Sequence, residues 1–326
     1  MKKVRWGLLS TANINRRLIP ALQASEHGEL VAVASRTQKR AQAYAEAWQI
    51  PKAYGSYEAL LASGAVDVVY IGLPNHLHAE WTIRALHSGL HVLCEKPLTI
   101  SMREMDAVIE AAGETGMVVA EAFMYRHHSQ TRTVGQWVGS GLLGEISLVR
   151  GVFNFKIKDR NNIRLVPEYG GGSLWDVGVY PLSFAQYVFG GPPANVSGAQ
   201  WLGPSGVDES FAGQMRYPGG GLAQISSSFR TPSHTELEVI GTEGRLHLNR
   251  PFVGVETGTL TFYPAEGDPQ AIEVPQEELY RGEVDDMHAA ILDGATPYIS
   301  LLETRNHVRT ALALYASARS GQMVAM

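Results

Sequence analysis

One lysine and one aspartate–tyrosine pair carry the side chains best suited to moving a proton. Lys96 lies in "EKPL" (95–98), directly after an apolar run, and Asp176 and Tyr180 lie in "GGGSLWDVGVYP" (170–181). Residues four apart share one face of a helix. An ammonium stabilises a neighbouring phenolate, so a Lys–Tyr–Asp cluster could move a proton at an alcohol oxygen while a nicotinamide exchanges a hydride with the adjacent carbon. The simpler alternatives are a surface lysine and a tyrosine packed in a domain interface.

The first strand-to-helix turn has the position of a dinucleotide-binding loop. "GLLSTANI" (7–14) ends an apolar run and opens a helical pattern. Such a turn needs small residues so that the backbone can approach the pyrophosphate. Ser10, Ala12 and Asn15 stand at the three glycine positions of the G-x-G-x-x-G pattern, and a serine hydroxyl can donate to a phosphate. A plain structural turn would look the same. The residues expected to line the pyrophosphate are Ser10, Thr11, Ala12, Asn13 and Ile14.

Cations follow the second strand-like run, where a cofactor without a 2′-phosphate usually meets an acid. Ser35 and Arg36 stand in "ASR" (34–36), and Lys39 and Arg40 follow at the helix start. A carboxylate would repel a 2′-phosphate, whereas an arginine can bind one bidentately. We therefore expect NADP(H) to be preferred, with NAD(H) as the second choice. A solvated helix start is the structural alternative.

Composition limits the class of protein. At 326 residues, with 45% hydrophobic and 18% charged residues, the chain is typical of a globular protein with two domains. A net charge of −5 without a run of like charges argues against a nucleic-acid surface. The single cysteine, Cys94, excludes an internal disulfide framework. No apolar run reaches the ~18 residues of a membrane helix, and the start lacks a signal-peptide pattern. A cytoplasmic protein without nucleic-acid or membrane partners is expected.

The order of strand and helix patterns predicts two different sheets. Apolar runs and helical patterns alternate up to about residue 120, with runs at 3–10, 29–35, 66–72, 91–95 and 117–122 and helices near 16–26, 38–48, 56–63, 78–88 and 101–115. Such alternation predicts a parallel, doubly wound sheet. After a helix near 129–139, period-two runs between Gly/Pro/Asn turns predict an antiparallel sheet. This second half of the chain also contains helical patterns at 173–189, 279–292 and 301–319. We expect a dinucleotide-binding domain at 1–122 and a substrate-binding and oligomerisation domain at 123–326.

Taken in order, these motifs resemble the glucose–fructose oxidoreductase / inositol dehydrogenase (Gfo/Idh/MocA) family. The resemblance covers nearly the whole chain and rests on "GLLSTANI", "ASR", "VYIGLPNHLH", "EKPL", "EAFMYRHH" and "GGGSLWDVGVYP", with "YASARSG" near the end. It is greatest to the branch of sugar-nucleotide ketoreductases, NADP-dependent xylose dehydrogenases and dihydrodiol dehydrogenases. The family implies a Rossmann domain followed by an α+β domain with a large, mainly antiparallel open sheet. Because such sheets often make oligomer contacts, a homodimer or homotetramer is expected.

The resemblance also implies roles for individual residues. Lys96 would be the catalytic-site lysine, Tyr180 the proton donor or acceptor, and Asp176 a carboxylate that orients the substrate. Many members carry histidine at the position of Tyr180, and the tyrosine form matches the branch named above. The loop "LPNHLH" maps beside the cofactor's ribose and nicotinamide. The further cofactor-binding candidates are Leu73, Pro74, Asn75, His78, Glu95 and Lys96, and the substrate-binding candidates are Lys96, His127, Arg164, Trp175, Asp176 and Tyr180.

Several candidates have an equally simple structural explanation. The two histidines of "NHLH" lack a carboxylate or cysteine at ligand spacing, so no metal is expected. His127 and His128 could reach the substrate or pack at an interface. Arg164 could meet a phosphate or a sugar hydroxyl, or form a surface salt bridge. Trp175 could stack on a sugar ring or fill the core.

Three functions fit the pattern. The leading one is an NADP(H)-dependent oxidoreductase that transfers a hydride to or from a secondary alcohol or ketone carbon of a sugar, sugar-nucleotide or cyclic polyol. The second is a glycosidase that keeps NAD(H) tightly bound and oxidises its substrate transiently. The third is a non-catalytic dinucleotide-binding regulator, for which Lys96→Met or Tyr180→Phe would leave NADPH binding unchanged and no sugar would be turned over.

Overall fold

The computed structural model describes residues 3–326. Met1 and Lys2, which the expected first domain includes, lie outside the described residues. The chain forms two compact units. The first runs up to Met124 and also includes Tyr280–Thr304, and the second comprises Tyr125–Leu279 and Arg305–Met326.

The first unit contains a six-stranded parallel sheet in the order β3-β2-β1-β4-β5-β6. This is the strand order of a doubly wound Rossmann sheet. All four residues of β4 are buried, as are all four of β6, because helices cover both faces of such a sheet. The strands are β1 (Val4–Leu9), β2 (Gly28–Ala34), β3 (Lys52–Tyr54), β4 (Val68–Ile71), β5 (His91–Glu95) and β6 (Val119–Ala122).

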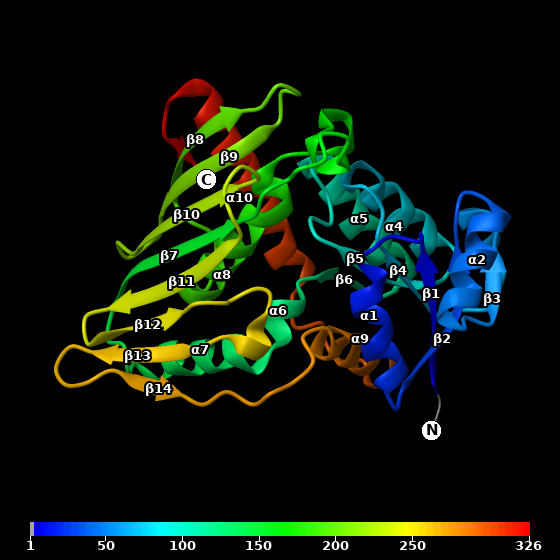
Figure 1. Cartoon of the computed structure of the whole chain (residues 1–326), viewed down its shortest axis with the longest axis horizontal. Coiled ribbons are helices and arrows are strands. Elements are labelled where there is room, and N and C mark those ends of the chain that lie inside the picture. The colour runs from blue at the N-terminus through cyan, green and yellow to red at the C-terminus, as the bar shows by residue number, and fades with distance from the viewer. Residues whose placement is uncertain (1–2) are drawn as a thin grey trace. The chain divides into compact units, whose positions relative to one another are not determined.

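Serine and threonine hydroxyls define where helices of the first unit begin. Thr37, Ser56 and Ser101 each accept a hydrogen bond from a backbone N–H three residues further on, which satisfies one of the orphan donors at a helix start. Strands and helices alternate along the chain (Figure 1). The helices of this unit are α1 (Asn15–Ala24), α2 (Gln38–Trp48), α3 (Tyr57–Leu61), α4 (His78–His87), α5 (Met102–Thr115) and α9 (Arg281–Asp293), with a 3₁₀ turn η1 (Asn75–Leu77) before α4.

Helix α9 joins this unit from far along the chain. Its His288 accepts a hydrogen bond from the indole of Trp6 in β1 (2.9 Å), and both side chains are buried. Ser25 lies 3.3 Å from the other ring nitrogen of His288. These contacts tie α9 to the middle of β1 and to the C-terminal end of α1.

The second unit contains a nine-stranded mixed sheet in the order β14-β13-β12-β11-β7-β10-β9-β8-β15 (Figure 1). Among the strand pairs of this sheet within the described residues, only β7–β10 is parallel. Strands that follow one another in the chain, such as β8 and β9 or β9 and β10, are joined by turns that contain glycine and proline. The strands are β7 (Ile146–Asn154), β8 (Asn195–Leu202), β9 (Asp208–Arg216), β10 (Leu222–Ser228), β11 (His234–Gly241), β12 (Gly244–Leu248), β13 (Leu260–Pro264), β14 (Gln270–Ile272) and β15 (Val324–Ala325).

Helices cover one face of this sheet and leave the other open. In β9, buried Phe211, Gly213 and Met215 alternate with exposed Ala212 and Gln214. The buried side packs on α8 and α10, which also contact each other through Gln186 and Thr310 (2.9 Å). The helical segments are α6 (Met124–His127), α7 (Ser129–Ser140), α8 (Val179–Phe189) and α10 (Leu301–Ser320), the 3₁₀ turns η2 (Ile163–Leu165), η3 (Pro167–Tyr169) and η5 (Val255–Thr257), and one π-helical turn, η4 (Leu174–Gly178).

The predicted fold class is confirmed, with differences in detail. The short strands β3, β14 and β15 were not predicted, because two or three exposed or half-buried residues carry no periodic signal. The stretch 173–189 is not one α-helix but a π-helical turn followed by α8. Residues 280–304 cluster with the first unit. The functional domains at 1–122 and 123–326 stay a prediction. Within residues 3–326, no helix combines the length and the apolar character needed to cross a membrane.

Candidate active site

The turn after β1 is built around the backbone of Ser10. Ser10 has a φ of 120°, in a region of backbone conformation that residues other than glycine rarely adopt. Its hydroxyl donates to the carbonyl of Gly72 (2.8 Å) and accepts from the N–H of Ala12 (3.2 Å). In this structure the serine hydroxyl therefore holds the loop, and a direct bond to a phosphate, as the sequence suggested, would require it to leave Gly72.

Asn15 fits at the third glycine position because a glycine lies opposite it. The Asn15 side chain is 1% exposed and donates to the carbonyl of Ser10 (2.9 Å). A Cβ at Gly72, directly after β4, would lie 3.3 Å from Asn15 Oδ1 and 3.2 Å from Ile14 Cγ2. The small residue that the loop requires is thus supplied by the neighbouring strand.

The start of α1 fits the pyrophosphate of a dinucleotide. Ile14, at the N-cap, provides no side-chain cap, and no acidic residue lies in the first turn. Arg16 and Arg17 follow on the exposed side. The positive end of the helix dipole and these cations favour an anion at this position. Thr11, Ala12 and Asn13 form the loop that leads to it.

The end of β2 presents a group of exposed cations. Ser35 is buried and donates its N–H to Tyr54, whereas Arg36, Lys39 and Arg40 are exposed. Burial raises the pKa of Tyr57, and the positive charges of Arg36 and Arg40 oppose that shift. No acid follows β2 here, so the residues present fit a 2′-phosphate.

Buried polar side chains fix the segment that carries Lys96. Glu95, the last residue of β5, accepts a hydrogen bond from the hydroxyl of Tyr70 in β4 (2.5 Å). Glu121 Oε1 accepts from the N–H of Leu98 (2.9 Å), and the Lys96–Pro97 peptide bond is cis. Burial, followed by the charge of Glu95, raises the pKa of Tyr70 well above its usual value, so this hydroxyl stays a donor.

His78 connects the loop after β4 to the same segment. Its imidazole is buried, with one nitrogen 2.8 Å from the carbonyl of Pro97 and the other 2.7 Å from that of Leu73. Burial lowers the pKa of His78. The predicted cofactor residues Leu73, Pro74 and Asn75 lie in this loop, and Asn75 begins η1. The structure therefore gives His78 backbone contacts that position Lys96-Pro97 and the loop.

In the second unit, Tyr180 lies in an aromatic cluster. The residue is 6% exposed, and its ring centroid lies 5.2 Å from that of Phe153, 5.5 Å from Phe252 and 5.6 Å from Tyr125. The hydroxyl of Tyr125 donates to the carbonyl of Tyr180 (3.2 Å). Three aromatic rings thus pack against Tyr180 at the start of α8.

Asp176 lies one π-turn before Tyr180 and pairs with Arg164. Arg164 Nε lies 2.6 Å from Asp176 Oδ2, and the Asp176 side chain is 13% exposed. Because residues 174–178 form a π-helix, the simple four-residue face of an α-helix does not describe the relation of Asp176 to Tyr180. Arg164 does form a salt bridge, but with the carboxylate predicted to orient the substrate.

Two further candidates are placed in the interior. Trp175 is buried, and its ring centroid lies 5.7 Å from that of Tyr315, so in this structure it packs against α10. His127 is buried at the end of α6. The neighbouring His128 caps α7, since its Nδ1 accepts from the N–H of Gln130 (3.1 Å).

The sequence did not indicate several residues that shape the site. Tyr70 and Gly72 lie in "VYIGLPNHLH" and Glu121 in "EAFMYRHH", but none of them was itself assigned a role, and Phe252 lies in no motif. Tyr70, Gly72 and Phe252 contact the predicted site residues Glu95, Ser10 and Tyr180, and Glu121 binds Leu98 of "EKPL". For Gly72 a signal existed: the large Asn15 at a glycine position requires a compensating small residue nearby. Phe252 comes from a loop after β12, and nothing in the sequence links it to Tyr180.

Family models match both parts of the chain. A model described as "Oxidoreductase family, NAD-binding Rossmann fold" matches residues 4–123. A second, the "GFO/IDH/MocA C-terminal domain", matches residues 131–247. Together they cover most of the chain, including both the loop after β1 and the segment with Asp176 and Tyr180.

Individual relatives extend the similarity over the full length. The chain is 41% identical over 322 residues to D-xylose 1-dehydrogenase (NADP(+)) 2 of Haloferax volcanii, with 98% of each chain covered. Among solved structures, it is similar to an aldose-aldose oxidoreductase from Caulobacter crescentus complexed with glycerol (TM-score 0.93, 27% identity, 100% of each chain). It is also similar to the 3-ketoreductase KijD10 of Actinomadura kijaniata in complex with NADP and TDP-benzene (TM-score 0.89, 30% identity, 97% of this chain and 98% of that one). The chain therefore belongs to the Gfo/Idh/MocA oxidoreductase family.

Proposed function

We propose that this protein is an NADP(H)-dependent oxidoreductase that transfers a hydride between the nicotinamide and a secondary alcohol or ketone carbon of a sugar, sugar-nucleotide or cyclic polyol. Its relatives include a xylose dehydrogenase and a sugar-nucleotide 3-ketoreductase, whose names specify sugar substrates. The observation that carries the proposal is the group of exposed cations after β2, on a Rossmann sheet with a lysine after β5.

On the cofactor side, the loop Ser10–Ile14 and the start of α1 would hold the pyrophosphate, and Ser35, Arg36 and Lys39 the 2′-phosphate. Leu73, Pro74, Asn75 and Glu95 would lie along the ribose and nicotinamide. NADP(H), when bound, supplies or accepts the hydride. The chain's own contribution is to orient it and to keep Lys96 in place through Tyr70, His78 and Glu121.

On the substrate side, Tyr180 would donate or accept the proton at the reacting oxygen, and the Lys96 ammonium would stabilise the phenolate form. Asp176 would accept a hydrogen bond from a substrate hydroxyl. Since Arg164 contacts Asp176, a substrate hydroxyl can be bound by both side chains, with the guanidinium as donor and the carboxylate as acceptor. Such a pair suits a polyol better than an apolar ketone.

The direct test is a panel of aldoses, keto-sugars and cyclic diols with NADP(H), measured by nicotinamide absorbance. We expect turnover of at least one sugar or polyol, with NADPH preferred to NADH. Absence of turnover across the panel, with NADPH bound, would favour the non-catalytic regulator considered from the sequence. The relatives named above are dehydrogenases, reductases and oxidoreductases, and their names lend no support to the regulator or to the glycosidase.

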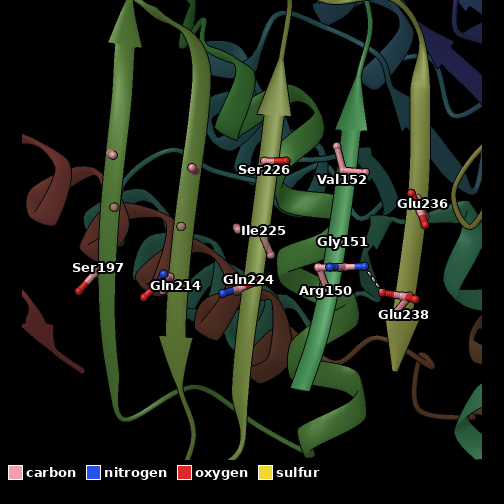
Figure 2. Close-up of a pocket in the computed structure, with 14 residues that line it drawn as sticks. Arg150, Gly151, Val152, Ser197, Gln214, Gln224, Ile225, Ser226, Glu236 and Glu238 are labelled. Carbon is pink, nitrogen blue, oxygen red and sulfur yellow. Dashed lines mark hydrogen bonds and ion pairs between the residues drawn. The ribbon is translucent and has the colours of Figure 1, made fainter. Parts of the chain in front are cut away.

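We also propose that the protein forms a homodimer or homotetramer through the open face of the second unit's sheet. Figure 2 shows this face, where β7, β8, β9, β10 and β11 present a shallow depression of about 550 Å³. Small side chains such as Ala199 and Ala212 are among the residues that line this depression. Glu238, although on this face, is largely buried between Arg150 and Arg245. A surface with both charge signs can complement itself across a two-fold axis.

The oligomer is tested by sedimentation of the wild type and of Ala212→Arg. A second copy on this face predicts that the long cation lowers the mass of the assembly at equal concentration. A monomeric wild type would contradict the proposal. Location in the cytoplasm stays a prediction from the sequence.

A further inference from the structure

Asp208 is a buried carboxylate that belongs to none of the predicted site motifs. It is the first residue of β9 and is 2% exposed. Its Oδ2 accepts hydrogen bonds from the hydroxyl of Ser173 and the N–H of Leu174, both at 2.8 Å. Its Oδ1 accepts from the hydroxyl of Tyr315 in α10 at 2.7 Å. One side chain thus joins a strand, the last helix and the start of the π-helical turn.

Two of these donors lie immediately before the predicted substrate residues. Ser173 is the N-cap of the π-helical turn, but its hydroxyl does not cap that turn. It points instead to Asp208, and it also lies 2.9 Å from the hydroxyl of Ser227 in β10. Asp208 therefore takes the place of the local cap, and a carboxylate at this end also complements the helix dipole.

The glycine run before the turn is required for this contact. Gly172 has a φ of +127°, and a Cβ there would overlap Asp208 Oδ1 and lie 2.8 Å from the Tyr315 hydroxyl. A Cβ at Gly171 would lie 2.8 Å from the carbonyl of Val166. These glycines allow close packing, because a side chain at Gly172 would separate Asp208 from the turn and one at Gly171 would press on the backbone of Val166.

Tyr315 extends the same anchor to Trp175. The Tyr315 ring lies 5.7 Å from that of Trp175 and 5.5 Å from that of Phe211, between the turn and the sheet. Burial and then the charge of Asp208 raise the pKa of Tyr315 well above its usual value, so its hydroxyl stays a donor. Burial also raises the pKa of Asp208, whereas the hydrogen bonds from Tyr315, Leu174 and Ser173 lower it. Removal of a donor or of the acceptor would leave buried polar groups unsatisfied.

We infer that Asp208, with Tyr315, is a positioning residue that fixes the π-helical turn and thereby the orientation of Asp176 toward the substrate. The inference rests on the proposed function for its catalytic part and on the contacts of residues 172–178 for its structural part. π-Helical turns are rare and occur frequently at functional sites. Here the turn needs an external acceptor, which β9 supplies.

The structural part is tested by amide hydrogen exchange of the purified wild type, Asp208→Asn and Tyr315→Phe. Asparagine keeps the size of the side chain but loses the charge and one acceptor oxygen. We expect exchange in residues 173–180 to rise by about tenfold in Asp208→Asn and less in Tyr315→Phe, because a buried hydrogen bond is lost. Tyr217→Phe is the matched control. Tyr217 is another buried tyrosine, just beyond the other end of β9, and its removal should leave this segment unchanged.

The catalytic part is tested by steady-state kinetics with a sugar that the panel identifies. We expect Asp208→Asn to lower kcat/KM by about tenfold, while the Kd for NADPH stays within about twofold. In an Asp176→Asn background the same change should have little further effect, since it acts through Asp176. Unchanged exchange in residues 173–180 would overturn the anchor. Faster exchange with unchanged kcat/KM, or fully additive effects with Asp176→Asn, would overturn the positioning role.

The two proposals fail in different ways. If the wild type turns over no sugar while Asp208→Asn still raises exchange in residues 173–180, the proposed function fails and the anchor is confirmed. If Asp208→Asn does not fold, Tyr315→Phe, which removes one hydroxyl, carries both measurements against Tyr217→Phe.

Discussion

The proposed cofactor residues of the first unit (the cofactor side) and the proposed substrate residues of the second unit (the substrate side) are held in place by different kinds of contact. On the cofactor side, Ser10, Gly72 and Lys96 directly follow the neighbouring strands β1, β4 and β5 of one parallel sheet. Ser10 donates to the backbone of Gly72, and His78, at the start of α4, contacts the backbone of Pro97. Parallel topology brings these strand ends to one edge. No comparable rule of sheet topology positions the residues of the substrate side.

On the substrate side, the supporting groups come from elements with no fixed relation in a parallel sheet. Asp176 depends on Arg164 from a 3₁₀ turn and, through the π-helical turn, on Asp208 and Tyr315. Tyr180 depends on Phe252 from a loop. The cofactor side is thus fixed by the topology of the sheet, and the substrate side by particular long-range contacts. This difference predicts that variants will separate cofactor binding from turnover.

The largest expected effect is that of Tyr180→Phe. Loss of the proton donor or acceptor should lower kcat by about 10²–10⁴-fold, the usual contribution of general acid–base catalysis. The Kd for NADPH should stay unchanged, because Tyr180 is not among the proposed cofactor-binding residues. Lys96→Met should lower kcat to a similar extent. Stopped-flow measurement of one turnover checks both, and an unchanged rate in Tyr180→Phe would remove it from proton transfer.

Acid should destabilise the first unit through His288. Burial lowers the pKa of this histidine from 6.5 to about 4. The folded protein therefore favours the neutral imidazole of His288. Its contribution to the free energy of unfolding is fully present above pH 6.5 and declines as the pH falls toward 4. At about 1.4 kcal/mol per pKa unit, the loss approaches about 3 kcal/mol. Denaturant unfolding between these pH values measures it. His288→Gln, which keeps a partner for Trp6, should flatten the dependence, and an equal slope in that variant would assign it to other groups.

Arg36→Asp should change cofactor choice. Replacing a cation by an anion near the 2′-phosphate removes a charged hydrogen bond, so the Kd for NADPH should rise by about 10–100-fold. NADH, which lacks this phosphate, should bind with little change. Intrinsic fluorescence titration with both cofactors gives the ratio. Equal weakening of NADPH and NADH would indicate a general defect rather than recognition of the phosphate.

Gly72→Ala should give the smallest effect and sharpen the account of the loop. The new Cβ would press on Ile14 and Asn15, and a shift of the loop should weaken NADPH binding by about threefold to tenfold. Gly113→Ala in α5 is the control, since its Cβ would meet no atom within 4 Å. Identical NADPH affinity in the two variants would show that the loop tolerates the added carbon.

The same difference explains what the sequence could predict. The doubly wound sheet, the loop after β1 and the position of Lys96 followed from apolar runs and the strand-end rule. The roles of Gly72 and His78 could be recognised only from the contacts that the structure shows at the carboxyl ends of the strands. The contacts of Asp208, Tyr315 and Phe252 could not be predicted, although Tyr315 begins "YASARSG", because only tertiary packing brings β9, α10 and the loop after β12 to the predicted substrate residues. The π-helical turn was also hidden, since its sequence has the apolar pattern of an ordinary helix.

The most direct test compares Arg36→Asp with Tyr180→Phe in two measurements, the Kd for NADPH and kcat at saturating NADPH with the identified sugar. Separate cofactor and substrate sides predict a crossed result. Arg36→Asp should raise the Kd by about 10–100-fold with kcat near that of the wild type, and Tyr180→Phe should lower kcat by at least about 10²-fold with an unchanged Kd. If both variants changed the Kd and kcat together, the assignment of these residues to separate roles in an NADP(H)-dependent oxidoreductase would be contradicted.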